Sequence, residues 1–205
     1  MLSIPNLITL ARILLVPVFV IAFALPGDTA RVVAFAVFCI AGASDALDGL
    51  AARRLNAGSE FGRMLDPIAD KILVAVALMM LVAEGSISQF VLTPGLRSLL
   101  KLVPALIILS REILVSGLRE FLAGAAVSLP VSSIAKLKTT IQMVAIGAML
   151  LEPLGEKYLP FAFGITYSAA AYIGLWIAAV LTVYTGYLYF RAGLKHLHAA
   201  PRGVS

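Results

Sequence analysis

The sequence contains eleven acidic residues, and four of them form a group of two pairs. Asp45 and Asp48 are three residues apart, and Asp66 and Asp70 are four apart. These spacings place the two carboxylates of each pair on one face of an α-helix. The short linker 54–61 predicts that the two helices are antiparallel neighbours. We therefore expect the four carboxylates to converge between these helices.

Such a group of aspartates needs a counter-charge if it lies close to a membrane. An ionised aspartate in mid-span costs about 2.5–3.5 kcal/mol on insertion scales, and four carboxylates also repel one another. One or two divalent cations would remove both penalties, and all-oxygen ligands favour a hard cation such as Mg²⁺ or Mn²⁺. Two metals held by carboxylates suit an in-line displacement at phosphorus. The four aspartates thus predict a divalent-metal site for phosphoryl transfer.

Small residues accompany the aspartates on the same helix faces. Gly49, Ala52 and Gly62 leave the backbone bare there, so that a nucleotide or a diphosphate can approach it. Two other interpretations apply to acids at such positions. A single aspartate near the end of a span is usually a solvated cap, and intramembrane acids also mark the ion path of a cation channel or a proton-coupled transporter. The matched pairs and the small residues favour the phosphoryl-transfer site.

The composition is that of a membrane protein. Of the 205 residues, 61 % are hydrophobic and only 13 % are charged, and the mean hydropathy is +1.01. A soluble domain has about half apolar and about a quarter charged residues. A disordered chain, a secreted disulfide scaffold and an ordinary cytosolic enzyme are excluded. The single cysteine, Cys39, permits neither an internal disulfide nor a cysteine-rich metal site. We expect an all-α integral membrane protein.

The apolar residues fall into six long segments, each close to the roughly 20 residues that cross the hydrocarbon core of a bilayer. The predicted spans are residues 9–27, 32–52, 65–83, 99–122, 132–151 and 163–190. Pro26-Gly27-Asp28 is typical of a short loop, and residues 124–130 must turn as well. We therefore expect a single transmembrane catalytic domain over residues 1–205, without a separate soluble domain.

The basic residues predict the orientation of these spans. Six spans put both termini on one side, and most basic residues fall on that side: Arg12, Arg53, Arg54, Arg63, Lys71, Arg119, Lys136, Lys138, Arg191, Lys195 and Arg202. The other side has Arg31, Arg97, Lys101 and Lys157. This excess predicts that both termini are cytoplasmic. It also accounts for the net charge of +5 by membrane topology, so we expect membrane lipid and no nucleic acid as a partner.

A second group of charges lies on the predicted fourth and fifth spans. Arg111 and Arg119 are eight residues apart on one helix face, and Lys136 and Lys138 begin the next span. Arginine and lysine are the usual partners of phosphate, which predicts a pocket for an anionic, phosphate-bearing acceptor. The alternative is that Arg111 and Glu112 pair with other helices to hold the bundle together, while the lysines are cytoplasmic anchors.

The aspartate segment resembles the signature of the CDP-alcohol phosphatidyltransferases. All eight specified residues of that signature are present at the same spacing. They are Asp45-x-x-Asp48-Gly49-x-x-Ala52-Arg53, followed after eight residues by Gly62-x-x-x-Asp66-x-x-x-Asp70. The resemblance implies a six-helix enzyme of the bacterial cytoplasmic (inner) membrane, usually a homodimer. Its members transfer a phosphatidyl-type group from a CDP-linked donor to an alcohol and release CMP.

The resemblance also implies a role for each matching residue. Asp45, Asp48 and Asp66 would ligate the metal, and Asp70 would complete the site and serve as the catalytic base. Gly49, Ala52, Arg53 and Gly62 would lie against the CDP group of the donor. Outside the signature, Asn6 and Thr9 suit hydrogen bonds to the donor head group, although an asparagine after a proline is as often a turn or a cap.

Three further stretches resemble the branch of the family that uses glycerol 3-phosphate. They are residues 4–12, 111–120 and 136–143. The implied reaction is CDP-diacylglycerol plus sn-glycerol 3-phosphate giving phosphatidylglycerophosphate plus CMP. A sister enzyme that uses inositol phosphate or phosphatidylglycerol as the acceptor is the alternative, because basic residues in similar places would suit those acceptors too.

Overall fold

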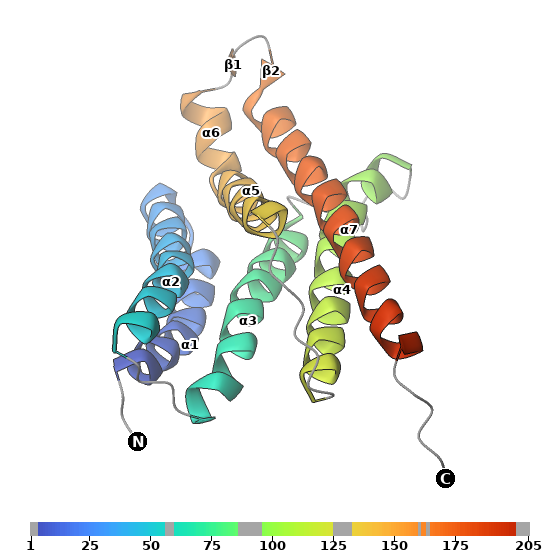
Figure 1. Cartoon of the computed structure of the whole chain (residues 1–205). Coiled ribbons are helices and arrows are strands. Elements are labelled where there is room, and N and C mark those ends of the chain that lie inside the picture. Colours follow the sequence, from blue (N-terminus) through green and yellow to red (C-terminus); the bar gives the residue numbers. More distant parts are fainter. Residues whose placement is uncertain are drawn as a thin grey trace.

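The computed structural model describes residues 4–55, 60–85, 96–124, 133–159, 161–162 and 165–199. These residues form helices and one small hairpin (Figure 1). In chain order the elements are α1 (Ile4–Ala24), α2 (Asp28–Leu55), α3 (Glu60–Glu84), α4 (Leu96–Gly124), α5 (Ser133–Leu150), α6 (Glu152–Tyr158), β1 (Phe161–Ala162), β2 (Ile165–Thr166) and α7 (Tyr167–Ala199). The two strands pair antiparallel, with Phe161 opposite Thr166.

The six long helices coincide with the six apolar segments, because each segment favours a helix that satisfies its own backbone. The loop predicted at Pro26-Gly27-Asp28 separates α1 from α2, except that Asp28 already begins α2. Gly27 has a φ of 104°, a value that favours glycine. The hairpin and α6 were not predicted, and α7 begins at Tyr167 rather than at residue 163. The helix α6 has only seven residues with Pro153 in its first turn, so it carries no hydropathy signal. Of the turn predicted at 124–130, residues 125–130 lie outside the described residues.

Two helices in the described part of the chain are long and apolar enough to cross a membrane by length and composition alone. They are the stretches Asn6–Ala24 in α1 and Tyr167–Leu194 in α7. The count of six spans therefore stays a prediction. The start of α1 and the end of α7 lie at the same end of the bundle as the junction between α2 and α3 (Figure 1).

The core forms where the helices cross. The helix α1 packs against α2 and α3, and α7 packs against α4 and α5. Phe19 of α1 and Phe38 of α2 are fully buried against each other, with ring centroids 6.2 Å apart. Leu81, Ile146 and Leu175 continue this core through α3, α5 and α7. These contacts fix the long helices as one bundle and so set the rotation of each about its axis.

Hydrogen bonds and ion pairs join the elements at the end opposite to the α2–α3 junction. Asp28 Oδ2, at the start of α2, accepts hydrogen bonds from Lys157 Nζ at 2.5 Å and from Tyr158 OH at 2.9 Å. Arg31 forms an ion pair with Glu84 at the end of α3. These contacts connect α6 to α2, and α2 to α3, at this end of the bundle.

We expect the Asp28 carboxyl to titrate below the ordinary aspartate value of about 4. The hydrogen bond from Lys157 lowers the pKa of this carboxyl most, and the one from Tyr158 adds to the effect. The contact with α6 is therefore complete above that ordinary value and is lost as the pH falls through the lowered pKa. The titration can be followed by ¹³C NMR of aspartate-labelled protein, with Asp28→Asn used to assign the signal. In Lys157→Gln the midpoint should rise toward the ordinary value, and an unchanged midpoint would contradict the pairing.

Candidate active site

The aspartates of the signature lie on two consecutive helices. Asp45 and Asp48 are in the C-terminal part of α2, and Asp66 and Asp70 are in the N-terminal part of α3. The two helices contact each other. Five peptide steps from Leu55 to Glu60 can span at most about 18 Å, so these helix ends stay close. The four aspartate side chains lie outside the described residues, and their convergence stays a prediction.

The other predicted contacts of the CDP group follow the same pattern. Gly49, Ala52 and Arg53 belong to α2, and Gly62 belongs to the first turn of α3. The structure thus places every signature residue in the C-terminal half of α2 or in the N-terminal half of α3. The burial and contacts of these residues are outside the described part of the chain.

A buried polar face of α1 lies beside this junction. Asn6, Thr9 and Arg12 are spaced by three residues, and each is at most 5 % exposed. Arg12 Nε donates a hydrogen bond to Ser44 Oγ at 3.1 Å, and Ser44 Oγ in turn donates to the carbonyl oxygen of Ala41 at 2.8 Å. Since Ser44 immediately precedes Asp45, the polar face of α1 meets α2 where the aspartate segment begins. Contact of Asn6 and Thr9 with a donor stays a prediction.

Arg12 is a candidate functional residue that the sequence analysis did not assign to the site. Arg12 belongs to the resembling stretch 4–12 and to the predicted cytoplasmic charges, and it falls inside the predicted span 9–27. A guanidinium inside an apolar span is costly without partners, and intramembrane ionisable residues mark functional sites by default. This cost is the feature of the sequence that points to Arg12 as a functional residue. In the structure, Arg12 is only 2 % exposed, so its side chain is fully packed.

A polar cluster joins α4, α5 and α7. One carboxylate oxygen of Glu112, Oε1, accepts hydrogen bonds from Arg111 Nη1 at 3.2 Å and from Lys138 Nζ. The other terminal nitrogen of Arg111, Nη2, donates to Thr185 Oγ1 at 2.9 Å. Lys138 is only 3 % exposed. Two cations, Arg111 and Lys138, share the Glu112 carboxylate in this cluster.

The four cations predicted to bind the acceptor phosphate fall into two classes. Arg111 and Lys138 make the interhelix contacts expected if they hold the bundle together, because Arg111 contacts Thr185 of α7 and Lys138 contacts Glu112 of α4. Arg119 in α4 and Lys136 in α5 are exposed to solvent. Residues 125–132, which join α4 to α5, lie outside the described part of the chain. A role in phosphate binding stays a prediction for all four cations.

The donor atoms of the possible metal ligands indicate which metal this chain could hold. Among the described residues, no group of three or more His, Cys, Asp or Glu side chains is placed to hold a metal ion. The signature aspartates would supply an all-carboxylate oxygen set from two adjacent helices, and this set fits Mg²⁺ or Mn²⁺. The donor chemistry therefore agrees with a divalent metal at the α2–α3 junction.

The family of this chain follows from its match to a family model. Residues 2–184 match the family model of CDP-alcohol phosphatidyltransferase. The chain belongs to the CDP-alcohol phosphatidyltransferase family. Members of this family are membrane-bound transferases and generally depend on a divalent metal.

Several relatives carry the name CDP-diacylglycerol–glycerol-3-phosphate 3-phosphatidyltransferase. A protein of Rickettsia felis is 41 % identical over 195 residues, which is 95 % of this chain and 97 % of the relative. A protein of Salmonella typhimurium is 42 % identical over 176 residues, or 85 % of this chain and 90 % of the relative. A protein of Shigella flexneri is 39 % identical over 198 residues, or 95 % and 97 %.

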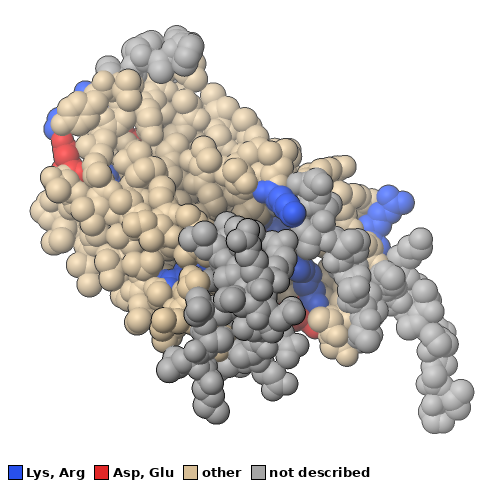
Figure 2. All heavy atoms as spheres, turned by 60° about the vertical axis from the view of Figure 1, so that its left-hand side comes forward, with Lys and Arg blue, Asp and Glu red and all other residues tan. Residues whose placement is uncertain are grey.

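The surface suits a CDP-alcohol phosphatidyltransferase that works in a membrane. Large apolar side chains point outward on several helices, among them Leu14, Ile21, Leu114, Val144 and Val180. Most of the surface that the described residues present in Figure 2 carries neither acidic nor basic side chains. Helices that face lipid expose such side chains, whereas a soluble monomer rarely exposes a large contiguous apolar patch.

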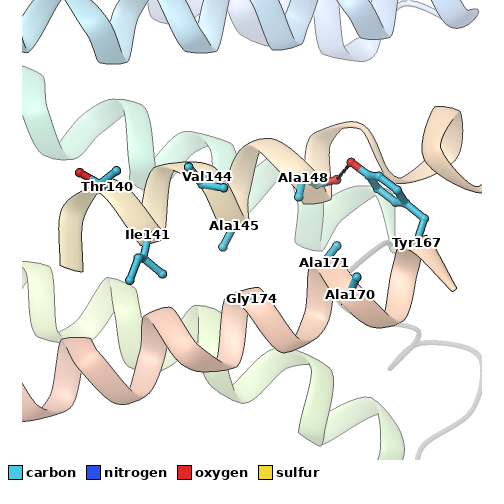
Figure 3. Close-up of a pocket in the computed structure, with 9 residues that line it drawn as sticks. All are labelled: Thr140, Ile141, Val144, Ala145, Ala148, Tyr167, Ala170, Ala171 and Gly174. Atoms are coloured by element: carbon cyan, nitrogen blue, oxygen red, sulfur yellow. Dashed lines mark hydrogen bonds between the residues drawn. The ribbon is translucent and has the colours of Figure 1, made fainter. Parts of the chain in front are cut away.

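Two apolar cavities lie between the helices of this CDP-alcohol phosphatidyltransferase. One, of about 600 Å³, lies between α2 and α5 and is lined by residues that include Phe38, Cys39 and Met143. The other, of about 290 Å³, lies between α5 and α7, where the Tyr167 hydroxyl donates to the carbonyl oxygen of Ala148 at 3.2 Å (Figure 3). Of the predicted site residues whose side chains the structure describes, none lines either cavity.

Proposed function

We propose that this chain transfers the phosphatidyl group of CDP-diacylglycerol to sn-glycerol 3-phosphate, giving phosphatidylglycerophosphate and CMP. The observation that carries the proposal is the identity of 39–42 % over most of the chain with relatives that bear the name of this activity. All eight signature positions support the same reaction class. The sister acceptors inositol phosphate and phosphatidylglycerol, and the transporter alternative, are outcomes of the test below.

We further propose a six-span protein of the bacterial cytoplasmic membrane with both termini in the cytoplasm, working as a homodimer. Six long helices support the span count. The start of α1 and the end of α7 lie at the same end of the bundle, which supports an even number of membrane crossings (Figure 1). The excess of basic residues predicted on that side supports the cytoplasmic location. Homodimerisation rests on the family resemblance.

Asp45, Asp48, Asp66 and Asp70 would hold Mg²⁺ or Mn²⁺, with two ions in each active site. The metal, when bound, would neutralise the diphosphate of the donor and the charge that develops on the leaving group. The bare backbone at Gly49, Ala52 and Gly62 leaves room for the CDP group. Arg53 would lie beside the departing CMP, and the buried polar face of α1 would contact the donor head group through Asn6 and Thr9.

Asp70 is the proposed general base. Its carboxylate would accept the proton of the C1 hydroxyl of glycerol 3-phosphate while that oxygen attacks the β-phosphorus of CDP-diacylglycerol. A new phosphorus–oxygen bond forms to the acceptor, and the bond between this phosphorus and the CMP oxygen breaks. The Arg12–Ser44 hydrogen bond would hold the start of the aspartate segment in place during this displacement.

The acceptor phosphate would bind at the positive charges of α4 and α5. The exposed pair Arg119 and Lys136 is accessible from the aqueous phase, and the cluster of Arg111, Lys138 and Glu112 lies deeper. Arginine and lysine suit this role because both make charge-assisted hydrogen bonds to phosphate oxygens. The two groups together would draw a dianionic acceptor from the cytosol toward the membrane.

The function is tested with purified protein, CDP-diacylglycerol, Mg²⁺ and a panel of acceptors. The panel consists of glycerol 3-phosphate, inositol phosphate, phosphatidylglycerol and uncharged glycerol, and CMP release is measured. Release with glycerol 3-phosphate and not with the others is the expected result. Preference for another acceptor would replace the proposed substrate, and no release with any acceptor would favour a transporter.

We expect Arg119→Gln and Lys136→Gln each to raise KM for glycerol 3-phosphate. Losing a charge-assisted hydrogen bond costs about 1.5–3 kcal/mol, or roughly ten- to a hundredfold in affinity. KM for CDP-diacylglycerol should change much less, since the aspartates lie on other helices. The control is Lys157→Gln, which removes an exposed cation at the opposite end. An unchanged acceptor KM together with weaker donor binding would move Arg119 and Lys136 to the donor site.

A further inference from the structure

The hydroxyl of Thr185 is held in one orientation between Arg111 and its own helix. Thr185 is 1 % exposed, and its Oγ1 accepts a hydrogen bond from Arg111 Nη2 at 2.9 Å. A guanidinium has donors only, so a lone pair of the hydroxyl must face Arg111. The hydroxyl proton must then point to a carbonyl oxygen of the preceding turn, that of Leu181 at 2.9 Å or of Thr182 at 3.1 Å. Rotation of the hydroxyl away from Arg111 would break both contacts.

The next residue, Gly186, makes room for the same arginine. A Cβ atom at this position would lie 3.0 Å from Cγ and 3.4 Å from Nε of Arg111. Contacts this short force the neighbour to give way by a few tenths of an ångström. One helical turn after Thr185, the ring of Tyr189 has its centroid 5.9 Å from Arg111 Cζ, within the range of a cation–π contact. One face of α7 therefore contacts Arg111 along its stem and at its guanidinium.

The guanidinium held in this way keeps donor capacity for an anion. Nη1 contacts Glu112, and Nη2 contacts Thr185. Nε is buried and has no hydrogen-bond partner among the described residues. Glu112 also accepts a hydrogen bond from Lys138, so Arg111 does not have this carboxylate to itself. An arginine with five N–H donors is therefore fixed in direction but not saturated.

We propose that Thr185 and Gly186 are positioning residues, which hold the Arg111 guanidinium in the orientation that receives the phosphate of the acceptor. The inference rests on the proposed function, and it assigns a role to a part of α7 that the sequence analysis treated only as a membrane span. Neither residue touches the substrate. Both act through Arg111. The Thr185 hydroxyl orients the guanidinium, and Gly186 leaves the space that the arginine side chain occupies.

The test compares Thr185→Val, Thr185→Ser and Gly186→Ala with Thr182→Val in the purified full-length protein. Thr182 is a matched control, because it is fully buried one turn earlier and its hydroxyl has no hydrogen-bond partner among the described residues. Thr185→Val should raise KM for glycerol 3-phosphate about tenfold. Gly186→Ala should also raise the KM for glycerol 3-phosphate. In both, kcat and the KM for CDP-diacylglycerol should stay within about twofold of wild type.

The conservative variant separates positioning from packing. Thr185→Ser keeps the hydroxyl and should restore the acceptor KM, and Thr182→Val should leave it unchanged. If Thr185→Val behaves like Thr182→Val, or raises the KM values of both substrates equally, the positioning role is overturned. A different preferred acceptor of the wild-type protein would overturn the proposed function alone, and the Thr185→Val effect would then appear on the KM of that acceptor.

Discussion

Replacing any one of Asp45, Asp48 or Asp66 by asparagine should abolish CMP release. Asparagine keeps the size of the side chain and removes the negative charge on which a hard cation depends. Loss of one preorganised electrostatic contact to the transition state costs roughly a hundred- to a thousandfold in rate, and a lost metal ligand should cost at least that much. CMP release from CDP-diacylglycerol in the presence of glycerol 3-phosphate and Mg²⁺ is the measurement.

The control for this prediction lies on the same helix. Asp28→Asn makes the same chemical change at the opposite end of α2, where the carboxylate pairs with Lys157. This variant should keep full activity. Binding of Mn²⁺, followed by electron paramagnetic resonance, should weaken in the Asp45, Asp48 and Asp66 variants and stay unchanged in Asp28→Asn. Full activity in any one of the three variants would refute its assignment as a metal ligand.

The Asp70→Asn variant should bind CDP-diacylglycerol but lose turnover. A general base contributes about 10²–10⁴-fold to the rate, and an amide cannot accept the proton of the acceptor hydroxyl. Donor affinity, measured by equilibrium binding, should fall much less than kcat. A variant that loses donor binding and turnover in the same proportion would instead make Asp70 an ordinary metal ligand.

The direct displacement that accompanies this role of Asp70 can be tested separately. One in-line attack inverts the configuration at phosphorus, so a chiral thiophosphate donor should give an inverted product. Labelled CMP should not exchange into CDP-diacylglycerol without an acceptor. Retention of configuration, or such exchange, would indicate a covalent phosphatidyl-enzyme and would reassign one aspartate as the nucleophile.

The sequence by itself determined the reaction class and the helical elements. Long apolar segments specify helices through local hydropathy, and the spacing of the signature aspartates follows from the helical repeat. The structure accordingly has long helices in all six segments and places both aspartate pairs on consecutive helices. The family match over residues 2–184 agrees with the signature. The short helix α6 escaped prediction because seven residues with a proline carry too little periodic signal.

Only the tertiary structure decided which polar groups meet across helices. Thr185 lies 74 residues from Arg111, and Lys138 lies 26 residues from Glu112. Such contacts depend on how each helix is rotated and where it crosses its neighbours, and packing of the whole core sets these angles. The Arg12–Ser44 hydrogen bond has the same origin in the α1–α2 crossing. Charge and spacing indicated that Arg111 needs partners, but the choice of Thr185 came from the way α4 and α7 pack together.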